Sequence, residues 1–356
     1  MNEDQIRNWK WNPDKTKKDK LMTILSAIWI FLVCVVLMTI SSFILSGSLE
    51  TLKARFHVSG GLLGMLAALG AATPEISSAA TALFVKQHDV GVGIIIGSNI
   101  FNLAALLGLC ALLAGNLPLR RQAMILNGAI SLVVILVLIL LVFGVISAPL
   151  SLVLLTLVLV PYAIVSGLKP AQMKRWKLPV KIRTFVTEAT ASTHQASDSP
   201  KTATPKSWSW AWMGGAALVV IVVTCMGMVR SAVFLSDAWG LNKTILGALV
   251  LTVFTGIPDV ITAIRMALDG RGTAVMSEAL NSNNLNILFG ICVPATVFGL
   301  GALAAQTIFS VWWLLGITVI NLFLLYFMKG FTRMSGVFSV GLYVVFVSVV
   351  IGWKLF

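Results

Sequence analysis

The chain has 356 residues, of which 58% are apolar and only 11% are charged. Soluble globular domains are about one quarter charged, so this composition excludes an ordinary soluble domain. The net charge is +13, but Lys and Arg lie between apolar runs and not along one amphipathic face. That arrangement indicates charges flanking membrane spans, so we expect the lipid bilayer as a partner and no nucleic acid.

The first part of the chain contains five apolar runs. A polar tail with both signs of charge occupies residues 1–20. Runs long enough to cross a bilayer then follow at about 21–47, 59–85, 91–115, 123–146 and 149–167. The first of these is longer than the core of a signal peptide and lacks an obvious cleavage site, so we expect it to remain as a span. Residues 21–167 therefore form a first five-helix unit.

Residues 168–210 interrupt this pattern. The segment is rich in Lys and Arg, then in Thr, Ser, Ala and Pro, and we expect a basic cytosolic linker without regular structure. Trp208, Trp210 and Trp212 follow where an aromatic belt would anchor the next span. Five more runs in 211–356 lie at about 211–235, 244–268, 273–300, 306–328 and 334–354.

This layout predicts an all-α polytopic membrane protein. About ten transmembrane helices would form two five-helix repeats, and an odd number of spans per half makes the repeats inverted. A cytosolic linker puts most basic loops on the cytosolic side and both termini outside, although the basic N-terminal tail conflicts with that orientation. The oligomeric state is left open.

Cysteine and histidine give no sign of a metal site. Cys34, Cys110, Cys225 and Cys292 lie inside apolar runs, and no CxxC or CxxH spacing occurs. His57, His88 and His194 lie in predicted loops, so we expect no buried imidazole ligand.

Two polar motifs recur in register within the apolar runs. Gly-Ala-Ala-Thr-Pro-Glu at 70–75 precedes Gly-Ser-Asn-Ile-Phe-Asn at 97–102, and Phe-Thr-Gly-Ile-Pro-Asp at 254–259 precedes Asn-Ser-Asn-Asn-Leu-Asn at 281–286. Each matched pair is separated by 184 residues: Glu75 and Asp259, Ser98 and Ser282, Asn102 and Asn286. Such repetition indicates an internal repeat.

The two acids are the strongest functional candidates. Glu75 and Asp259 lie well inside predicted spans, where an ionised carboxylate costs at least a few kcal/mol, so such residues are paired, cation-bound or protonated. Together they present up to −2, which would balance a divalent cation. Without a cation the pair should share a proton, because like charges a few Å apart repel.

Neighbouring residues could add oxygen ligands. Pro74 and Pro258 cannot donate hydrogen bonds, which would free the carbonyls of Gly70 and Phe254 at a broken helix. Ser98 and Asn102 share one helix face, as do Ser282 and Asn286, and hydroxyl and amide oxygens suit Na⁺ and Ca²⁺. The alternative is that the prolines are kinks and the Ser and Asn residues only hold helices together.

These motifs resemble the cation/calcium antiporter superfamily, which includes the sodium/calcium exchangers. The resemblance covers about 59–115 and 244–300 and the five-plus-five layout. It implies a secondary antiporter and not an enzyme, without cofactor or catalytic residues, exchanging Ca²⁺ for Na⁺ or H⁺ in the plasma (cytoplasmic) membrane. It also implies that inorganic cations bind the repeated acids, Ser and Asn residues, and the hydroxyl of Thr255.

The sequence departs from the family pattern at several positions. The family has Gly-Thr-Ser-x-Pro-Glu, whereas Ala71, Ala72 and Gly256 here lack the hydroxyls that help to form sodium sites. Ser78 and Thr262, each three residues after an acid, could replace them, or could bond back to their own helices. These losses favour protons as counter-ion, while the superfamily as a whole favours Na⁺.

Glu278 and Asn281 are further departures, since the family has Asn and Gly there. Glu278, Ser282 and Asn286 form one i, i+4, i+8 stripe, so Glu278 could be a third acid on the access path and a proton acceptor. The alternative is a position at the membrane interface, paired with Arg271 or Arg265.

Other functions are less compatible with the sequence. An intramembrane aspartyl protease needs an acid dyad in motifs that this chain lacks, and no nucleotide-binding loop indicates a primary pump. A cation channel is the third alternative, but an inverted repeat with broken helices favours alternating access.

Overall fold

The computed structural model describes residues 17–56, 60–167, 180, 184–189, 208–328 and 330–353, most of them helical. The first half contains α2 (Lys17–Phe56), α3 (Gly60–Phe84), α4 (His88–Phe101), α5 (Leu107–Ala114), α6 (Arg121–Val142) and α7 (Ala148–Gly167). The second contains α10 (Ser209–Trp239), α11 (Lys243–Ile245), α12 (Thr252–Thr255), α13 (Ile257–Leu268), α14 (Gly272–Leu285), α15 (Val293–Phe298), α16 (Ala305–Met328) and α17 (Arg333–Gly352). Three π-helical segments, η1 (Asn102–Leu106), η2 (Leu246–Leu251) and η3 (Asn286–Cys292), continue α4, α11 and α14.

The predicted spans all correspond to helical segments. Seven described helices have the length and apolar composition to cross a membrane, or eight when residues 243–255 and 257–268 count as one span bent by 53°. The other two predicted spans are α3, with 25 residues, and the unbroken run through α14, η3 and α15. Both are long enough for a bilayer, and both carry predicted site residues. The polytopic all-α fold is therefore confirmed.

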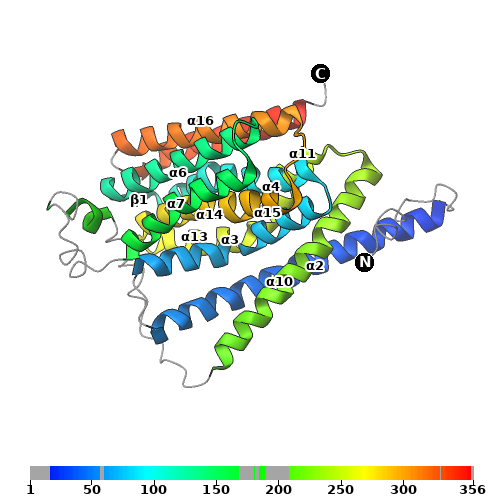
Figure 1. The fold of residues 1–356 in the computed structure, drawn as a ribbon, viewed down its shortest axis with the longest axis horizontal. Coiled ribbons are helices and arrows are strands. Elements are labelled where there is room, and N and C mark those ends of the chain that lie inside the picture. The colour runs from blue at the N-terminus through cyan, green and yellow to red at the C-terminus, as the bar shows by residue number, and fades with distance from the viewer. Residues whose placement is uncertain are drawn as a thin grey trace.

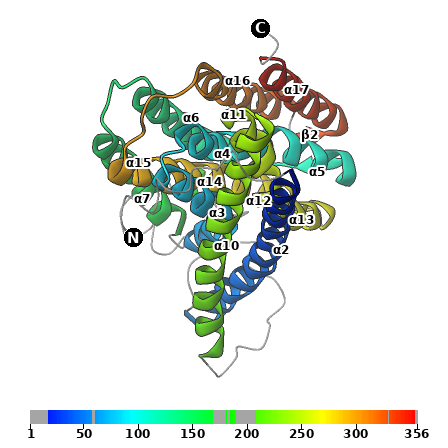
Figure 2. The same cartoon turned by 90° about the vertical axis from the view of Figure 1, so that its right-hand side faces the viewer.

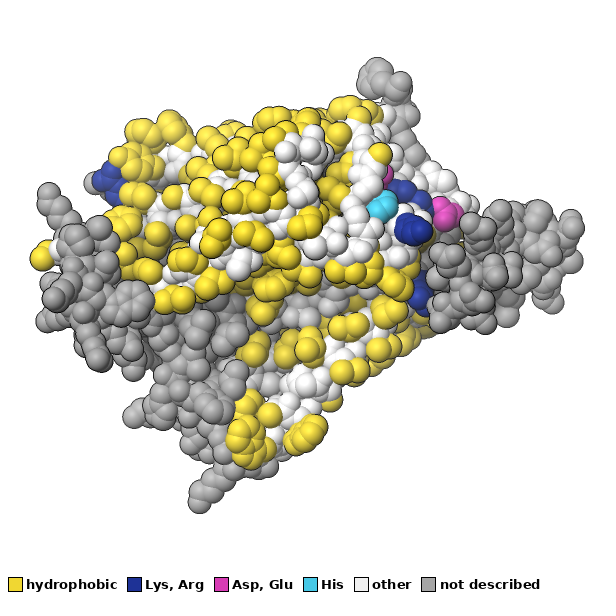
Figure 3. Space-filling model, viewed as in Figure 1, with side chains coloured by type: hydrophobic (Ala, Val, Ile, Leu, Met, Phe, Trp, Pro, Cys, Tyr) yellow, Lys and Arg dark blue, Asp and Glu magenta, His cyan; other side chains and the backbone are white. Residues whose placement is uncertain are grey.

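The outer surface is suited to lipid. Large apolar side chains are exposed along the outer helices, among them Trp29, Trp212 and Phe323. Figure 3 shows a broad apolar face whose charged side chains gather near its two ends. An apolar band between charged ends is the surface expected of a membrane-spanning bundle.

The interior is built around α4 and α14. α2 and α10, which begin the two halves, pack along each other at one side of the bundle (Figures 1 and 2). α4 packs against α3 and η2, while α14 packs against α3 and α6. Nearly all residues of α4 and α14 are buried, so the polar motifs that they carry lie at the centre of the molecule.

Loops from both halves meet at the two ends of the bundle. At one end, β1 (Asn116–Pro118) pairs antiparallel with β2 (Gly330–Thr332), and Thr273 donates to the Pro118 carbonyl. We call residues 115–121, 269–273 and 330–333 the basic end, because Arg side chains lie there. At the opposite end, Asp89 accepts hydrogen bonds from the Ala304 amide and the Thr307 hydroxyl. The loops therefore alternate between ends as the predicted layout requires.

Two local predictions need correction. Residues 184–189 of the linker are helical, with Val186 buried against Val165 and with Glu188 accepting a hydrogen bond from Gln122, whereas no regular structure was expected. His88 is the first residue of α4 and does not lie in a loop. Most of the N-terminal tail, most of the linker, His57 and His194 lie outside the described residues.

Glycines let α4 approach η2 closely. A Cβ on Gly97 would lie 2.3 Å from the Ala248 carbonyl oxygen, and a Cβ on Gly247 would lie 2.5 Å from the Val90 carbonyl oxygen. Real Cβ atoms do not tolerate such distances from backbone. Small residues at both positions therefore set the spacing between the two repeats.

We expect Gly97→Ala to destabilise the folded protein by about 1–3 kcal/mol, because the added methyl group must push η2 away. Thermal unfolding of the purified protein in detergent measures the effect. Gly215→Ala in α10 is the control, since a Cβ there meets no atom within 4 Å. Equal melting temperatures for the two variants would contradict the close packing of α4 on η2.

Candidate cation site

Glu75 lies at the centre of the first repeat. It follows Pro74 in α3, and its side chain is 0% exposed. The Ser98 hydroxyl, from α4, donates to Glu75 Oε1 at 3.1 Å, while Glu75 Oε2 has no partner in the protein. α3 runs through Pro74 as one helix, so the break predicted in this repeat is absent. Membrane helices tolerate an interior proline in this way.

Asp259 occupies the equivalent place in the second repeat, but its surroundings differ. The helix bends by 53° at Gly256, and Asp259 lies in the first turn of α13, 9% exposed. Asp259 Oδ1 has no partner, and neither has the Ser282 hydroxyl, although the equivalent Ser98 bonds to Glu75. Asp is one methylene shorter than Glu, and together with the bend this gives the two acids unequal environments.

Asparagines join the two repeats by reciprocal hydrogen bonds. Asn99 Nδ2 donates to the Asn283 carbonyl at 3.1 Å, and Asn283 Nδ2 donates to the Asn99 carbonyl at 3.0 Å. Asn102 Nδ2 donates to Asn283 Oδ1, and Asn286 Nδ2 donates to Asn99 Oδ1, both at 3.1 Å. Each bond has a partner related by the 184-residue offset, so we call these four residues the asparagine clasp.

The clasp leaves buried oxygens without partners. Several side-chain oxygens around the two acids accept or donate no hydrogen bond in the protein: Glu75 Oε2, Ser78 Oγ, Asn102 Oδ1, Asp259 Oδ1, Ser282 Oγ and Asn286 Oδ1. Buried polar atoms normally have partners, so a concentration of unpartnered oxygens requires an explanation. In the described part of the chain no group of three or more His, Cys, Asp or Glu could hold a metal ion. A cation here would therefore need neutral oxygens besides the two carboxylates.

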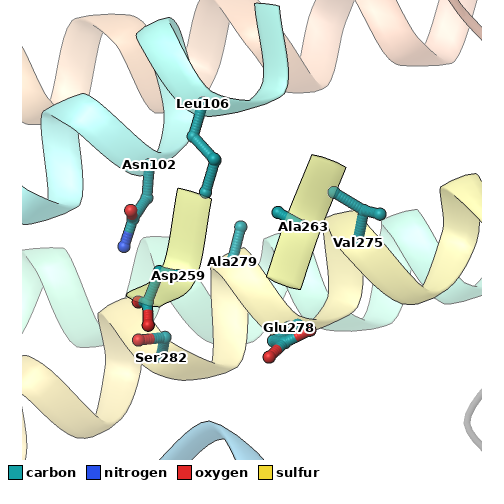
Figure 4. Close-up of a pocket in the computed structure, with 8 residues that line it drawn as sticks. All are labelled: Asn102, Leu106, Asp259, Ala263, Val275, Glu278, Ala279 and Ser282. Atoms are coloured by element: carbon teal, nitrogen blue, oxygen red, sulfur yellow. The ribbon is translucent and has the colours of Figure 1, made fainter. Parts of the chain in front are cut away.

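A small pocket reaches this region from the side of α13 and α14. Figure 4 shows Asp259 and Ser282 pointing toward each other, with Asn102 opposite them and Glu278 farther along α14. Leu106, Ala263, Val275 and Ala279 complete the lining. Ala263 and Val275 lie on the stretches of α13 and α14 that lead to the loop at residues 269–271, so the pocket extends toward the basic end.

Three predicted hydroxyls take different positions. Ser78 is fully buried one turn after Glu75, and its Oγ has no partner. Thr255 is also buried, but its hydroxyl donates to the Leu251 and Thr252 carbonyls. Thr262 is exposed, and its hydroxyl donates to the Pro258 carbonyl at 3.0 Å. Thr262 therefore bonds back to its own helix, which was the alternative to a ligand role.

Some features of the site were not singled out from the sequence. Asn99 and Asn283 are also 184 residues apart, and this equal offset is a sequence signal for a symmetric contact. The π-helical segments η1 and η3 begin at the equivalent residues Asn102 and Asn286. Such segments are rare in proteins and are frequent at functional sites. Asn281 accepts a hydrogen bond from Tyr162, a contact without any sequence signal.

We expect Asn99→Ala and Asn283→Ala each to destabilise the protein by about 1–3 kcal/mol, because each leaves buried partners unpaired. The double variant should cost less than the sum of the two, since the residues share bonds. Thermal unfolding of the four proteins measures this coupling. Strict additivity would show that the clasp does not act as a unit.

Comparison with known proteins identifies relatives of this fold. A family model described as "Sodium/calcium exchanger protein" matches residues 26–167 and 209–352. Human sodium/potassium/calcium exchanger 4 is 41% identical over 69 residues, which are 19% of this chain and 11% of that protein. The putative antiporter CaxA of Alkalimonas amylolytica is 24% identical over 261 residues, 72% of this chain and 74% of that protein.

Two solved structures share the fold. The H⁺/Ca²⁺ exchanger CAX has a TM-score of 0.67 at 13% identity, over 92% of this chain and 86% of that one. The sodium-calcium exchanger NCX_Mj has a TM-score of 0.59 at 19% identity, over 90% and 98%. At sequence identities this low, the similarity to the two structures shows a shared fold and nothing about function. Because the family model matches both halves of the chain, this protein belongs to the sodium/calcium exchanger protein family.

Proposed function

We propose that this protein is a secondary antiporter that exchanges Ca²⁺ for Na⁺ or H⁺ across a membrane, with the transported cation held between Glu75 and Asp259. One observation carries the proposal: two buried carboxylates face a set of unpartnered oxygens at the junction of two inverted repeats. Buried charge in a membrane protein is expensive, and a bound cation would neutralise it.

The available ligands suit calcium. Ca²⁺ takes about 6–8 oxygens from carboxylates, amides, hydroxyls and carbonyls. Glu75 and Asp259 supply the charge, and the unpartnered oxygens of Asn102, Asn286 and Ser282 can add neutral ligands. Ser98 holds the Glu75 carboxylate through Oε1, which leaves Oε2 for the ion.

The fold alone is compatible with either counter-ion. One structural relative is named a sodium-calcium exchanger and the other an H⁺/Ca²⁺ exchanger. In this chain Ala71, Ala72 and Gly256 offer no hydroxyl, and Thr255 directs its proton to backbone carbonyls. These features weaken sodium coordination and favour coupling to protons.

The position of the basic end supports an orientation. If it faces the cytosol, as the positive-inside rule requires, the pocket beside Asp259 extends toward the cytosol. The cytoplasmic membrane is the location that we propose.

Calcium uptake into liposomes tests the two acids. We expect Glu75→Gln and Asp259→Asn each to lower uptake at least about 100-fold, since losing even an outer partner of a metal ligand costs about 10–100-fold. Asp269→Asn, an exposed carboxyl at the end of α13, is the matched control. Robust uptake by either site variant that folds as the wild type does would overturn the site assignment.

Imposed gradients test the counter-ion. We expect an outward H⁺ gradient to drive calcium uptake by the wild-type protein more strongly than an outward Na⁺ gradient, because the sodium-site hydroxyls are missing. Uptake driven by Na⁺ alone would contradict this expectation and would direct attention to Ser78, whose buried hydroxyl has no partner.

A further inference from the structure

Glu278 lines the pocket beside the two proposed cation ligands Asp259 and Ser282. It lies on α14 one turn before Ser282, on the basic-end side, and it is partly exposed (Figure 4). The equivalent residue of the first repeat, Ile94, is 0% exposed where α4 packs against η2. The third carboxyl therefore distinguishes one repeat from the other.

A structural salt bridge does not account for Glu278. Among the described residues Glu278 takes part in no salt bridge, although the sequence offered Arg271 and Arg265 as partners. Arg271 immediately precedes α14 at the basic end.

The charged and titratable groups on the elements around α14 are few. In the described part of the chain they are Glu75 on α3, His88 and Asp89 at the far start of α4, Cys110 on α5, Arg121 at the start of α6, Asp259 and Arg265 on α13, Arg271 at the start of α14, Cys292 on η3 and, from α7, Tyr162, which donates a hydrogen bond to Asn281, while η1 and β1 supply none. Of these, Asp259 shares the pocket with Glu278. Two ionised carboxylates in one poorly hydrated pocket repel each other, and either a cation or a proton relieves that repulsion.

Independent evidence indicates that this pocket receives a ligand. Ser282 is 2% exposed and Asn102 is 1% exposed, and Ser282 Oγ and Asn102 Oδ1 have no partner in the protein. Both residues line the pocket with Glu278. Glu278 itself lies nearer the basic end, outside any group of three acids that could hold one metal ion. Glu278 therefore has a role other than coordinating one cation together with Glu75 and Asp259.

We propose that Glu278 is the proton-binding residue of this pocket, and that cation entry displaces its proton. When a cation reaches Asp259 and Ser282, the O–H bond of Glu278 breaks, the proton leaves to the solution at the basic end, and the carboxylate keeps its charge. The proton returns when the cation leaves. This inference rests on the proposed cation exchange and names the group that would couple it to protons.

Calorimetry in buffers of different ionisation enthalpy counts the protons released as Ca²⁺ binds to the purified protein. We expect Glu278→Gln to release about one proton fewer per Ca²⁺ than the wild type. Its calcium binding constant should therefore change about tenfold less for each pH unit than that of the wild type. Glu278→Asp should retain the release, because it keeps a carboxyl. Asp269→Asn should match the wild type, because its carboxyl is exposed outside the pocket.

Equal proton release by the wild type and Glu278→Gln would overturn the proposal, and so would calcium binding by the wild type without any proton release. The second outcome needs no variant, so the test survives a variant that fails to fold. If the wild type binds no Ca²⁺, the proposed function fails, and infrared titration without cation then tests Glu278 separately. A protonated-carboxyl signal that is present in the wild type and absent from Glu278→Gln in the difference spectrum would support the assignment. Identical spectra would overturn it, because a proton shared by Glu75 and Asp259 contributes equally to both proteins.

Discussion

The crossing of α4 and α14 is the contact on which the site depends. The asparagine clasp uses the donors of Asn99, Asn102, Asn283 and Asn286 between the halves and leaves the Oδ1 atoms of Asn102 and Asn286 unpartnered. Neither half can make these bonds alone. The same contact that holds the repeats together therefore also creates the oxygen-lined region between the two acids.

The asparagine clasp is symmetric between the two repeats, but the residues around it are not. Glu75 is held by Ser98 inside a continuous helix, whereas Asp259 lies after a 53° bend with one oxygen unpartnered. A pocket extends toward the basic end beside Asp259, where Glu278 replaces the buried Ile94 of the first repeat. These residues are the places where the two inverted repeats differ in this structure.

Much of the fold followed from sequence because a bilayer restricts it. Apolar runs of about 20 residues can only be spans, and the 184-residue offset identified the repeat and both acids. The orientation of single side chains did not follow. Thr262 lies exposed while Ser78 is buried, although both stand three residues after an acid, because exposure depends on which neighbouring helices cover each side of α3 and α13. The π-helical segments and the contact of Tyr162 with Asn281 depend on packing between distant helices, which local sequence does not encode.

The most direct test of this account is the position of the ion itself. A crystal structure with Sr²⁺ or Ba²⁺ would locate the cation from its anomalous scattering. We predict one peak between Glu75 and Asp259, with carboxylate and Asn102 or Asn286 oxygens at about 2.3–2.6 Å for a calcium-sized ion, slightly longer for the heavier ones. A principal peak elsewhere, with Glu75 and Asp259 free of the ion, would contradict the account.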